Sequence, residues 1–142
     1  MRQVKHLLET KGSGVYSIAP DAPVLDAVRR MAEHGVGALL VLRGEQLAGI
    51  ISERDYARKV ILKDRSSANT PVADIMTSSV LTVDRDASVE DCMRLCTDSH
   101  IRHLPVVDGE RVIGVISIGD LVKAVIDEQA EQIGQLQRYI AS

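Results

Sequence analysis

Two serine–aspartate pairs with the same spacing are the residues best suited to bind a ligand. Ser52 and Asp55, and later Ser117 and Asp120, each close a Gly-x-x-Ser-x-x-Asp segment after an aliphatic run. Such a run predicts a strand that leads into a helix, and the free N–H groups at a helix start bind anions such as phosphate. A serine hydroxyl can donate to that phosphate, and an aspartate can accept from the paired hydroxyls of a ribose. The simpler interpretation is a capping box, in which both side chains only satisfy first-turn N–H groups.

Both pairs lie in an internal repeat that organises the chain. Shifted by 65 residues, Tyr16–Val60 aligns with Leu81–Val125 without a gap. An apolar turn upstream of each copy also repeats, since Val4, Leu7 and Leu8 correspond to Val72, Ile75 and Met76. We therefore divide the sequence into repeat 1 (1–64), a polar linker (65–71), repeat 2 (72–127) and a C-terminal helical extension (128–142).

Each repeat predicts the element order β-α-β-β-α. A short extended segment precedes an amphipathic helix, and two aliphatic strands follow around a glycine-centred hairpin turn. The last helix begins at the Ser-x-x-Asp pair, and in repeat 1 we expect it over Glu53–Leu62. One copy buries too little surface to be stable alone. We therefore expect an α+β fold in which the two repeats pack with pseudo-twofold symmetry and leave one ligand cleft per repeat.

The composition argues against several classes of function. The net charge is −3 with both signs interspersed, and the chain has no Phe or Trp and only three Tyr, so a nucleic-acid surface is not expected. No apolar run approaches the roughly 20 residues of a membrane span, and the N-terminus has no stretch of signal-peptide length. We expect a cytoplasmic protein without a membrane partner, although removal of an organellar transit peptide would leave the same pattern. No nucleophile elbow, Walker A, HExxH or GxGxxG motif is present, so we do not expect an enzyme.

Cysteine and histidine side chains in the middle of repeat 2 suggest a metal or redox site as an alternative. These residues are Cys92, Cys96, His100 and His103. In the repeat alignment Cys92 matches Ala27 and Cys96 matches Met31, positions that we expect on the buried helix face. A buried free cysteine behaves as a small hydrophobic residue, and His103 belongs to the next strand. We therefore predict no metal ligand here.

The chain resembles the tandem CBS domain pair, or Bateman module, over about residues 1–127. The resemblance rests on VADIMT (Val72–Thr77), RHLPVVDGE (Arg102–Glu110) and the two segments that end at Asp55 and Asp120. ERDYARKV (Glu53–Val60) is similar to small single-module members of bacteria and plant organelles. The resemblance implies a regulatory module that senses AMP, ADP, ATP, NAD-type dinucleotides or S-adenosylmethionine, needs no catalytic cofactor, and modulates a protein that the sequence does not identify.

The resemblance also implies which residues bind the ligand. The serine and aspartate contact phosphate and ribose, the first strand contacts adenine, and the segment after the first helix forms the opposite wall. In repeat 1 the predicted residues are Tyr16, Ser17, Ile18, Gly37, Ala38, Leu39, Ser52, Arg54 and Asp55. In repeat 2 they are Leu81, Thr82, Val83, Arg102, His103, Leu104, Pro105, Ser117 and Asp120. The first strand could equally be an ordinary edge strand, and the charged positions ordinary surface residues.

The two predicted sites differ in size and charge. Gly37 and Ala38 leave the first roomy, whereas Arg102 and His103 add bulk and positive charge to the second. Arginine suits phosphate contact, and histidine titrates near pH 6.5. Arg54 is close enough in sequence to Ser52 to reach a phosphate. We expect a dinucleotide of the NAD type to prefer the first site and AMP to fit the second.

An apolar stripe continues beyond repeat 2 into the C-terminal extension. Its members are Val122, Val125, Ile126, Ile133, Leu136 and Ile140. A stripe longer than one domain needs usually meets another chain, so we expect a homodimer. The alternative is a tail that folds back on its own module. For the whole chain, the main alternative to a sensor is an interaction scaffold that kept the fold and lost its ligand.

Overall fold

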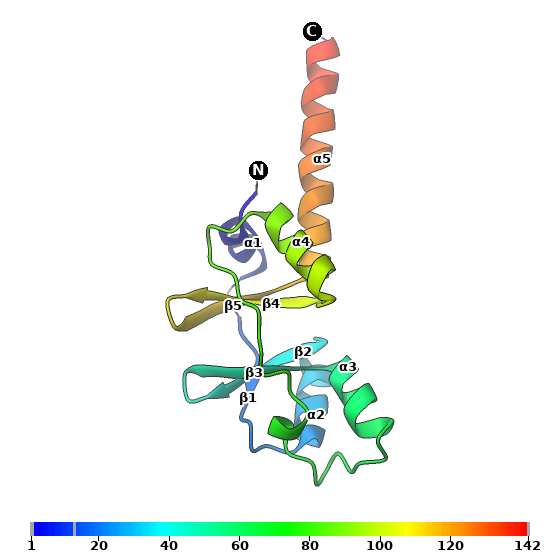
Figure 1. Cartoon of the computed structure of the whole chain (residues 1–142). Helices are drawn as coiled ribbons and strands as arrows, with labels where there is room; N and C mark the ends of the chain where they lie inside the picture. The colour runs from blue at the N-terminus through cyan, green and yellow to red at the C-terminus, as the bar shows by residue number, and fades with distance from the viewer. Residues whose placement is uncertain (1, 13, 142) are drawn as a thin grey trace. The chain divides into compact units, whose positions relative to one another are not determined.

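The computed structural model describes residues 2–12 and 14–141, which form two compact units. Unit 1 is built from residues 1–14, 82–108 and 113–142, and unit 2 from residues 15–81 and 109–112. Repeat 1 has the predicted β-α-β-β-α order, and repeat 2 has the same order except that its first strand is reduced to a single bridge, so the α+β fold class is confirmed (Figure 1).

Unit 2 is a three-stranded sheet with helices packed on one face (Figure 1). Strand β1 runs parallel to β2, and β3 runs antiparallel to β2. The elements are β1 (Ser17–Ile18), α2 (Val24–His34), β2 (Ala38–Arg43), β3 (Gln46–Ser52) and α3 (Glu53–Tyr56). The helix predicted over Glu53–Leu62 is α-helical only in α3 and continues as a π-helical turn over Ala57–Ile61. The aliphatic core of this unit centres on Val24, Leu39 and Ile51.

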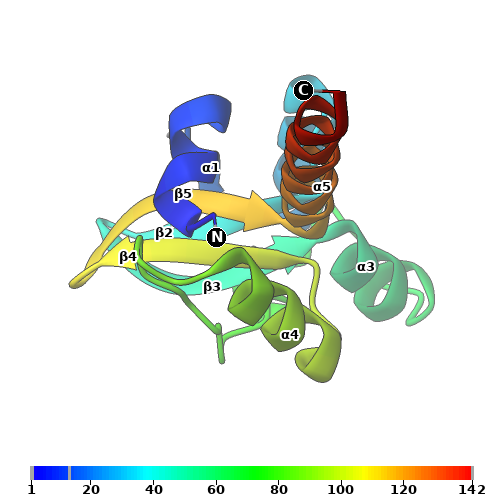
Figure 2. The same cartoon turned by 90° about the horizontal axis from the view of Figure 1, so that it is seen from above.

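Unit 1 is a two-stranded hairpin covered by three helices (Figures 1 and 2). Its elements are α1 (Val4–Lys11), α4 (Val89–Ser99), β4 (His103–Asp108), β5 (Arg111–Ser117) and α5 (Ile118–Ala141). The short strand expected over Leu81–Val83 is reduced to one parallel bridge between Val83 and Val106. The core contains Leu104, Val106 and both cysteines.

The apolar turn at the start of each repeat packs on the other repeat. Helix α1 begins repeat 1 but belongs to unit 1, which holds most of repeat 2, and there Val4 N donates to Ala87 O at 2.9 Å. The short 3-10 helix η2 (Val72–Asp74) begins repeat 2 but belongs to unit 2, which holds most of repeat 1, and there Val72 N donates to Ala22 O at 2.8 Å. Ala22 and Ala87 are equivalent in the repeat alignment, so the two exchanged turns fill equivalent places. The compact units therefore cross the boundaries of the sequence repeats.

A glycine opens each Gly-x-x-Ser-x-x-Asp segment because the exchanged turn lies against it. A Cβ on Gly49 would lie 2.7 Å from the carbonyl oxygen of Thr77 and 2.8 Å from Met76 Sδ. A Cβ on Gly114 would lie 2.6 Å from Leu8 Cδ2. All three distances are shorter than a Cβ atom tolerates, so the motif and the exchange are parts of one packing arrangement.

The polar linker between the repeats packs on unit 2 and completes the start of α2. Pro23, the residue before α2, has no side-chain capping bond. The first helical N–H groups instead find acceptors in the linker, since Val24 N donates to Thr70 O at 2.8 Å and Leu25 N to Ser67 O at 3.0 Å. Thr70 is 4% exposed. The linker therefore satisfies N–H groups that a helix cannot satisfy internally.

Helix α5 is continuous from Ile118 to Ala141, and Gly134 does not break it. Its first turns are anchored in the core of unit 1 by Leu121 and Ala124. Its later turns extend past α1 and α4 (Figure 1). Among the described residues, no helix combines the length and the apolar character that a membrane span requires.

Candidate functional site

The Ser-x-x-Asp pair of repeat 1 forms a reciprocal capping box at the start of α3. Asp55 N donates to Ser52 Oγ at 3.2 Å, and Ser52 N donates to Asp55 Oδ2 at 3.0 Å. The serine hydroxyl also lies 3.0 Å from Asp55 Oδ2. The capping interpretation is thus confirmed, and it fixes a carboxylate and a hydroxyl at a helix start.

The pair in repeat 2 has the same backbone geometry. Asp120 N donates to Ser117 Oγ at 3.1 Å, and Ser117 N donates to Asp120 Oδ2 at 2.8 Å. The side chain of Asp120 is 27% exposed and that of Asp55 is 13% exposed. Each unit therefore presents one preorganised, partly accessible carboxylate at the end of a strand.

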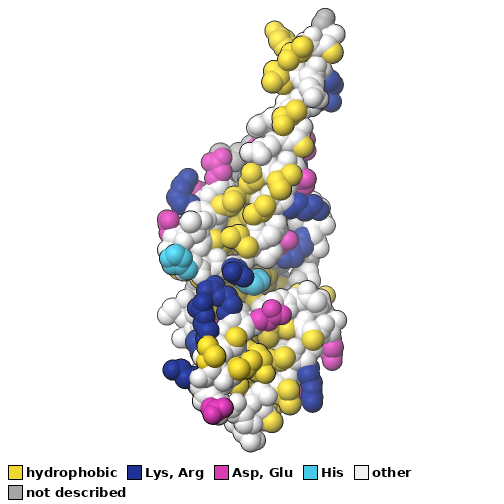
Figure 3. All heavy atoms as spheres, turned by 90° about the vertical axis from the view of Figure 1, so that its right-hand side faces the viewer, with side chains coloured by type: hydrophobic (Ala, Val, Ile, Leu, Met, Phe, Trp, Pro, Cys, Tyr) yellow, Lys and Arg dark blue, Asp and Glu magenta, His cyan; other side chains and the backbone are white. Residues whose placement is uncertain are grey.

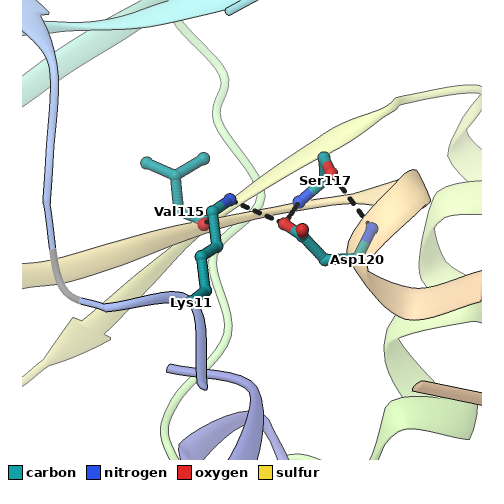
Figure 4. Close-up of polar contacts among 4 residues, drawn as sticks. All are labelled: Lys11, Val115, Ser117 and Asp120. Atoms are coloured by element: carbon teal, nitrogen blue, oxygen red, sulfur yellow. Dashed lines mark hydrogen bonds and ion pairs between the residues drawn. The ribbon is translucent and has the colours of Figure 1, made fainter. Parts of the chain in front are cut away.

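A lysine contacts each of these carboxylates, and neither lysine was among the predicted site residues. In unit 2, Lys59 Nζ lies 3.1 Å from Asp55 Oδ1 and donates to Ile75 O at 2.9 Å. In unit 1, Lys11 Nζ lies 2.6 Å from Asp120 Oδ2 and donates to Val115 O at 2.9 Å (Figure 4). The i, i+4 spacing of Asp55 and Lys59 was a usable signal. No local pattern links Lys11 to Asp120.

The charges around Asp120 shift the pKa values of two groups. Burial favours the neutral carboxyl of Asp120, but hydrogen bonds from Lys11 and Ser117 and the charge of Lys11 outweigh burial, so its pKa lies below the usual value. Burial lowers the pKa of His103, and the charges of Lys11 and Arg102 lower it further against the opposing charge of Asp120. The imidazole of His103 is therefore neutral near pH 7, and Asp120 is ionised.

The wall residues predicted for repeat 1 lie beside its motif. Ala38 pairs with Ser52 in the β2–β3 ladder, and Glu53 N donates to Gly37 O at 3.0 Å. Arg54 lies in the first turn of α3. Leu39 is 1% exposed and belongs to the core, so only its backbone is available to a ligand.

The first strand of repeat 1, β1, pairs with the edge of β2 opposite to β3. Ser17 and Ile18 pair with Leu40 and Val41, and Ile18 is a core residue. The ring of Tyr16 stacks on His34, with centroids 4.0 Å apart and planes inclined by 14°. The tyrosine is 43% exposed, so this stacked pair presents an accessible aromatic surface directly before β1.

In repeat 2 the structure brings together some of the predicted residues. Ile118 N donates to Arg102 O at 2.8 Å, which places Arg102 and His103 beside the start of α5. Val83 N donates to Pro105 O at 3.1 Å. Three further predicted residues are placed differently: Leu104 is buried in the core, Thr82 begins a segment of unit 1, and Leu81 belongs to unit 2.

An open hollow of about 580 Å³ lies on unit 2, at the opposite end of β2 from Ala38. Its lining residues are Ala19, Pro20, Asp21, Leu42, Arg43, Gly44, Pro71 and Ala73. None of them belongs to the predicted site, and the lining holds one acidic and one basic side chain among mostly small or apolar residues. We assign no ligand to it.

The two cysteines are core residues of unit 1. Cys92 is 0% and Cys96 is 2% exposed. Burial and the nearby Cys96 raise the pKa of the Cys92 thiol to about 11, and burial also raises that of Cys96. A thiol needs its thiolate form to react or to bind a metal, so both side chains are suited to packing.

Comparison with known proteins places both repeats in one family. The family model described as "CBS domain" matches residues 5–62 and 72–127. A mitochondrial CBS domain-containing protein of Arabidopsis thaliana, CBSX3, is 50% identical over 125 residues, which are 84% of this chain and 61% of that protein. The chain thus spans less than two thirds of that relative's length.

Solved structures agree. A putative signal-transduction protein with CBS domains from Burkholderia ambifaria is 49% identical, with a TM-score of 0.87, and the match covers 90% of this chain and 96% of that one. The CBS domain pair of protein MJ0100, solved with 5′-methylthioadenosine and S-adenosyl-L-methionine, shares the fold at 22% identity and a TM-score of 0.81, covering 90% of this chain and 98% of that one. The chain belongs to the CBS-domain family and contains a pair of CBS domains.

Proposed function

We propose that this CBS pair is a regulatory module that binds adenine nucleotides at the two Ser-x-x-Asp motifs and modulates a partner protein. The observation that carries the proposal is the repetition of one arrangement in both units. A carboxylate and a hydroxyl are held at a helix start by bonds between 2.8 and 3.2 Å. A carboxylate that only caps a helix can be fully buried, whereas those of Asp55 and Asp120 are partly accessible.

The chemistry of this arrangement fits a nucleotide. A carboxylate accepts from the paired hydroxyls of a ribose, and a helix start with nearby cations favours a phosphate. Lys59 supplies a cation in unit 2, and Lys11 and Arg102 supply cations in unit 1. The adenosine-containing ligands of the related CBS pair support adenine as the base. AMP, ADP, ATP and NAD-type ligands remain the candidate class, and no catalytic step is part of the proposal.

Ligand-dependent thermal stability tests this proposal against the scaffold alternative. A ligand at 100 times its dissociation constant stabilises a fold by about 2.7 kcal/mol per site, which raises the melting temperature of a domain of this size by several degrees. We expect such a rise with at least one of AMP, ADP, ATP, NAD or S-adenosylmethionine at millimolar concentration. An unchanged melting temperature with all five would favour the scaffold.

Thiol labelling tests the redox alternative separately. Buried cysteines with raised pKa values should react with a thiol reagent only at the rate of local unfolding. Rapid labelling of Cys92 or Cys96 in the native protein would support the redox alternative.

We further propose that α5 mediates a homodimer. The hydrophobic side chains of α5 reach its C-terminal end (Figure 3), and Ile126, Ile133 and Ile140 are 57%, 57% and 74% exposed. These isoleucines are spaced by seven residues, and Val122, Gln129 and Leu136 form the second row of the same heptad pattern. The first row is isoleucine throughout, and the second row contains one valine, one glutamine and one leucine. Isoleucine in the first row with leucine in the second favours a two-stranded coiled coil.

Light scattering tests the dimer. Deleting the chain from Glu128 onward should convert a dimer into a monomer. The substitution Ile133→Asp should do the same with α5 intact, whereas Gln135→Asp, which lies outside the seam, should leave the dimer unchanged. A full-length chain that is monomeric at high concentration would contradict this proposal.

A further inference from the structure

Lys11 is held at the ribose-binding carboxylate proposed for unit 1. Its ammonium group lies 2.6 Å from Asp120 Oδ2 and 2.9 Å from the carbonyl oxygen of Val115 (Figure 4). The lysine ends α1, the helix that begins repeat 1 and packs in unit 1, which holds most of repeat 2. The residue that contacts Asp120 therefore comes from outside the repeat that carries the motif.

The lone pairs of Asp120 decide what a ribose must do to bind there. Each carboxylate oxygen has two acceptor sites. Oδ2 already accepts from Ser117 N at 2.8 Å and from Lys11, so both of its sites are used. A ribose whose two hydroxyls contact both carboxylate oxygens must therefore displace Lys11. Ser117 N, a backbone group at the end of β5, cannot make room.

This exchange is unfavourable for a neutral ligand. The ammonium–carboxylate bond is charge-assisted, and a hydroxyl in its place is not a charged partner. The displaced ammonium would also remain close to Arg102 and His103, since the charges of Lys11 and Arg102 both act on His103. A ligand that brings its own anionic group gives Lys11 a new partner and removes this cost.

We infer that Lys11 makes the unit 1 site selective for nucleotides over nucleosides. A ribose that binds both oxygens of Asp120 displaces the Lys11 ammonium group, which then requires a phosphate of the same ligand as its new partner. The inference rests on the proposed function and adds a specificity determinant to it. Lys11 then acts twice, first as the partner of the carboxylate and afterwards as a ligand of the phosphate.

The unit 2 site lacks this requirement. Asp55 Oδ2 accepts from Ser52 N and from the Ser52 hydroxyl, which can rotate away, and Lys59 lies on Oδ1. One acceptor site on each oxygen can therefore receive a ribose hydroxyl while Lys59 stays in place. We expect adenosine to compete with AMP better at this site than at Asp120.

Calorimetric titration with AMP and with adenosine tests the inference. Full-length Asp55→Ala isolates the unit 1 site and serves as the background for three further substitutions. In this background AMP should bind more than tenfold more tightly than adenosine, a ratio that corresponds to about one charge-assisted hydrogen bond. Adding Lys11→Gln should weaken AMP binding, strengthen adenosine binding and reduce the ratio of the two affinities to about threefold or less.

Two matched variants separate the specific role of Lys11 from other effects. Lys5→Gln removes the same charge from the same helix, where Lys5 lies 3.7 Å from Asp86, and should leave the ratio unchanged. Lys11→Arg keeps a cation and should retain most of the ratio, which also shows that the site is folded. An unchanged ratio in Lys11→Gln, or an equal change in Lys5→Gln, would overturn the inference with the proposed function intact. Failure of the unsubstituted chain to bind any of AMP, ADP, ATP, NAD and S-adenosylmethionine would instead overturn the proposed function itself.

Discussion

The two motifs share one backbone geometry but recruit their lysines differently. Lys59 belongs to the helical segment that follows Ser52, four residues beyond Asp55, whereas Lys11 comes from a segment 109 residues away from Asp120. Both ammonium groups join the motif carboxylate to a backbone carbonyl, Ile75 O in unit 2 and Val115 O in unit 1. The comparison teaches that the repeated element is the carboxylate and its backbone donors, and that the cation is supplied by whichever segment lies within reach.

The largest difference that we expect between the units concerns the two motif glycines. Gly49→Ala places a Cβ against the backbone oxygen of Thr77, whereas Gly114→Ala meets the end of the Leu8 side chain, which can move. We predict that the free energy of unfolding falls by about 3 kcal/mol for Gly49→Ala and by about 1 kcal/mol for Gly114→Ala. Urea denaturation measures both values.

Gly134→Ala is the control for these variants. Apart from the neighbouring residues and the backbone of its own helix, no atom lies within 4 Å of the Cβ position at Gly134, and alanine is the better helix former by about 1 kcal/mol. Stability should therefore stay the same or rise. Equal losses of unfolding free energy for Gly49→Ala and Gly114→Ala would contradict this prediction, because they would show that the backbone at Thr77 moves as easily as the Leu8 side chain.

Replacing each aspartate should separate two binding events. Asp55→Ala and Asp120→Ala each remove an acceptor from the ribose, and losing a bond to a charged group costs on the order of 1.5–3 kcal/mol. Each variant should thus lose about tenfold or more in affinity for one event only. Calorimetry with AMP resolves the events. Loss of both events in either variant would mean that the sites are coupled.

Acid should reveal the Lys11 contact through stability. The pKa of Asp120 is lowered in the folded chain. Its ionised form therefore contributes stability above the unfolded value near 3.9, and this contribution is lost as the pH falls through the lower folded value. The deficit in unfolding free energy of Asp120→Asn relative to the unsubstituted chain should be constant from pH 7 to 5 and shrink below about pH 4. Urea midpoints measured at pH 3, 4, 5 and 7 provide the test, and a deficit that does not change with pH would contradict it.

The smallest expected effect concerns His103, whose counterpart in repeat 1 is Ala38. Because burial and the charges of Lys11 and Arg102 lower its pKa, the imidazole should titrate below about 6.5 and stay neutral through most of the range from pH 7.5 to 6. The phosphate of AMP itself gains a proton near pH 6. We therefore expect AMP affinity at this site to change by about twofold or less over that range.

A proton NMR titration checks the His103 prediction directly. Lys11→Gln removes one of the charges that lower the pKa of His103 and should raise that pKa slightly. His103→Gln assigns the resonance and should leave the pH profile of AMP binding unchanged. A His103 pKa above 6.5 in the unsubstituted chain would contradict the charge arrangement described for unit 1.

The sequence was sufficient to predict the element order and the two motifs, because these depend on local patterns. Alternating apolar residues around Gly44 and Gly109 predicted the hairpins, and Ser52 and Ser117 marked the strand-to-helix junctions. Because the repeat aligns without a gap, each assignment in one copy supported the same assignment in the other. A prediction from local sequence is most secure where the strand, turn and capping signals all indicate the same structure.

The exchange of the apolar turns at the start of the repeats and the role of Lys11 were not predictable in the same way. The turns around Val4 and Val72 have similar apolar patterns, so either could pack on either repeat. The glycines at 49 and 114 indicate close packing but not which segment provides it. Lys11, at the end of α1, has the properties of any cation near a helix C-terminus, and only the packing of α1 in unit 1 brings it to Asp120.

The exchange of α1 also has a consequence for synthesis on the ribosome. Most of unit 2 comes from one stretch of chain, residues 15–81, so its sheet and helices emerge together. Helix α1 emerges earlier but packs against segments that begin at residue 82, and Asp120 emerges later still. Nascent α1 must therefore wait, with its apolar face uncovered, while the intervening residues are added at roughly 5–20 per second. Unit 1 becomes complete only when α1 meets the segments that follow residue 82, which leaves α1 accessible to chaperones and proteases during that interval.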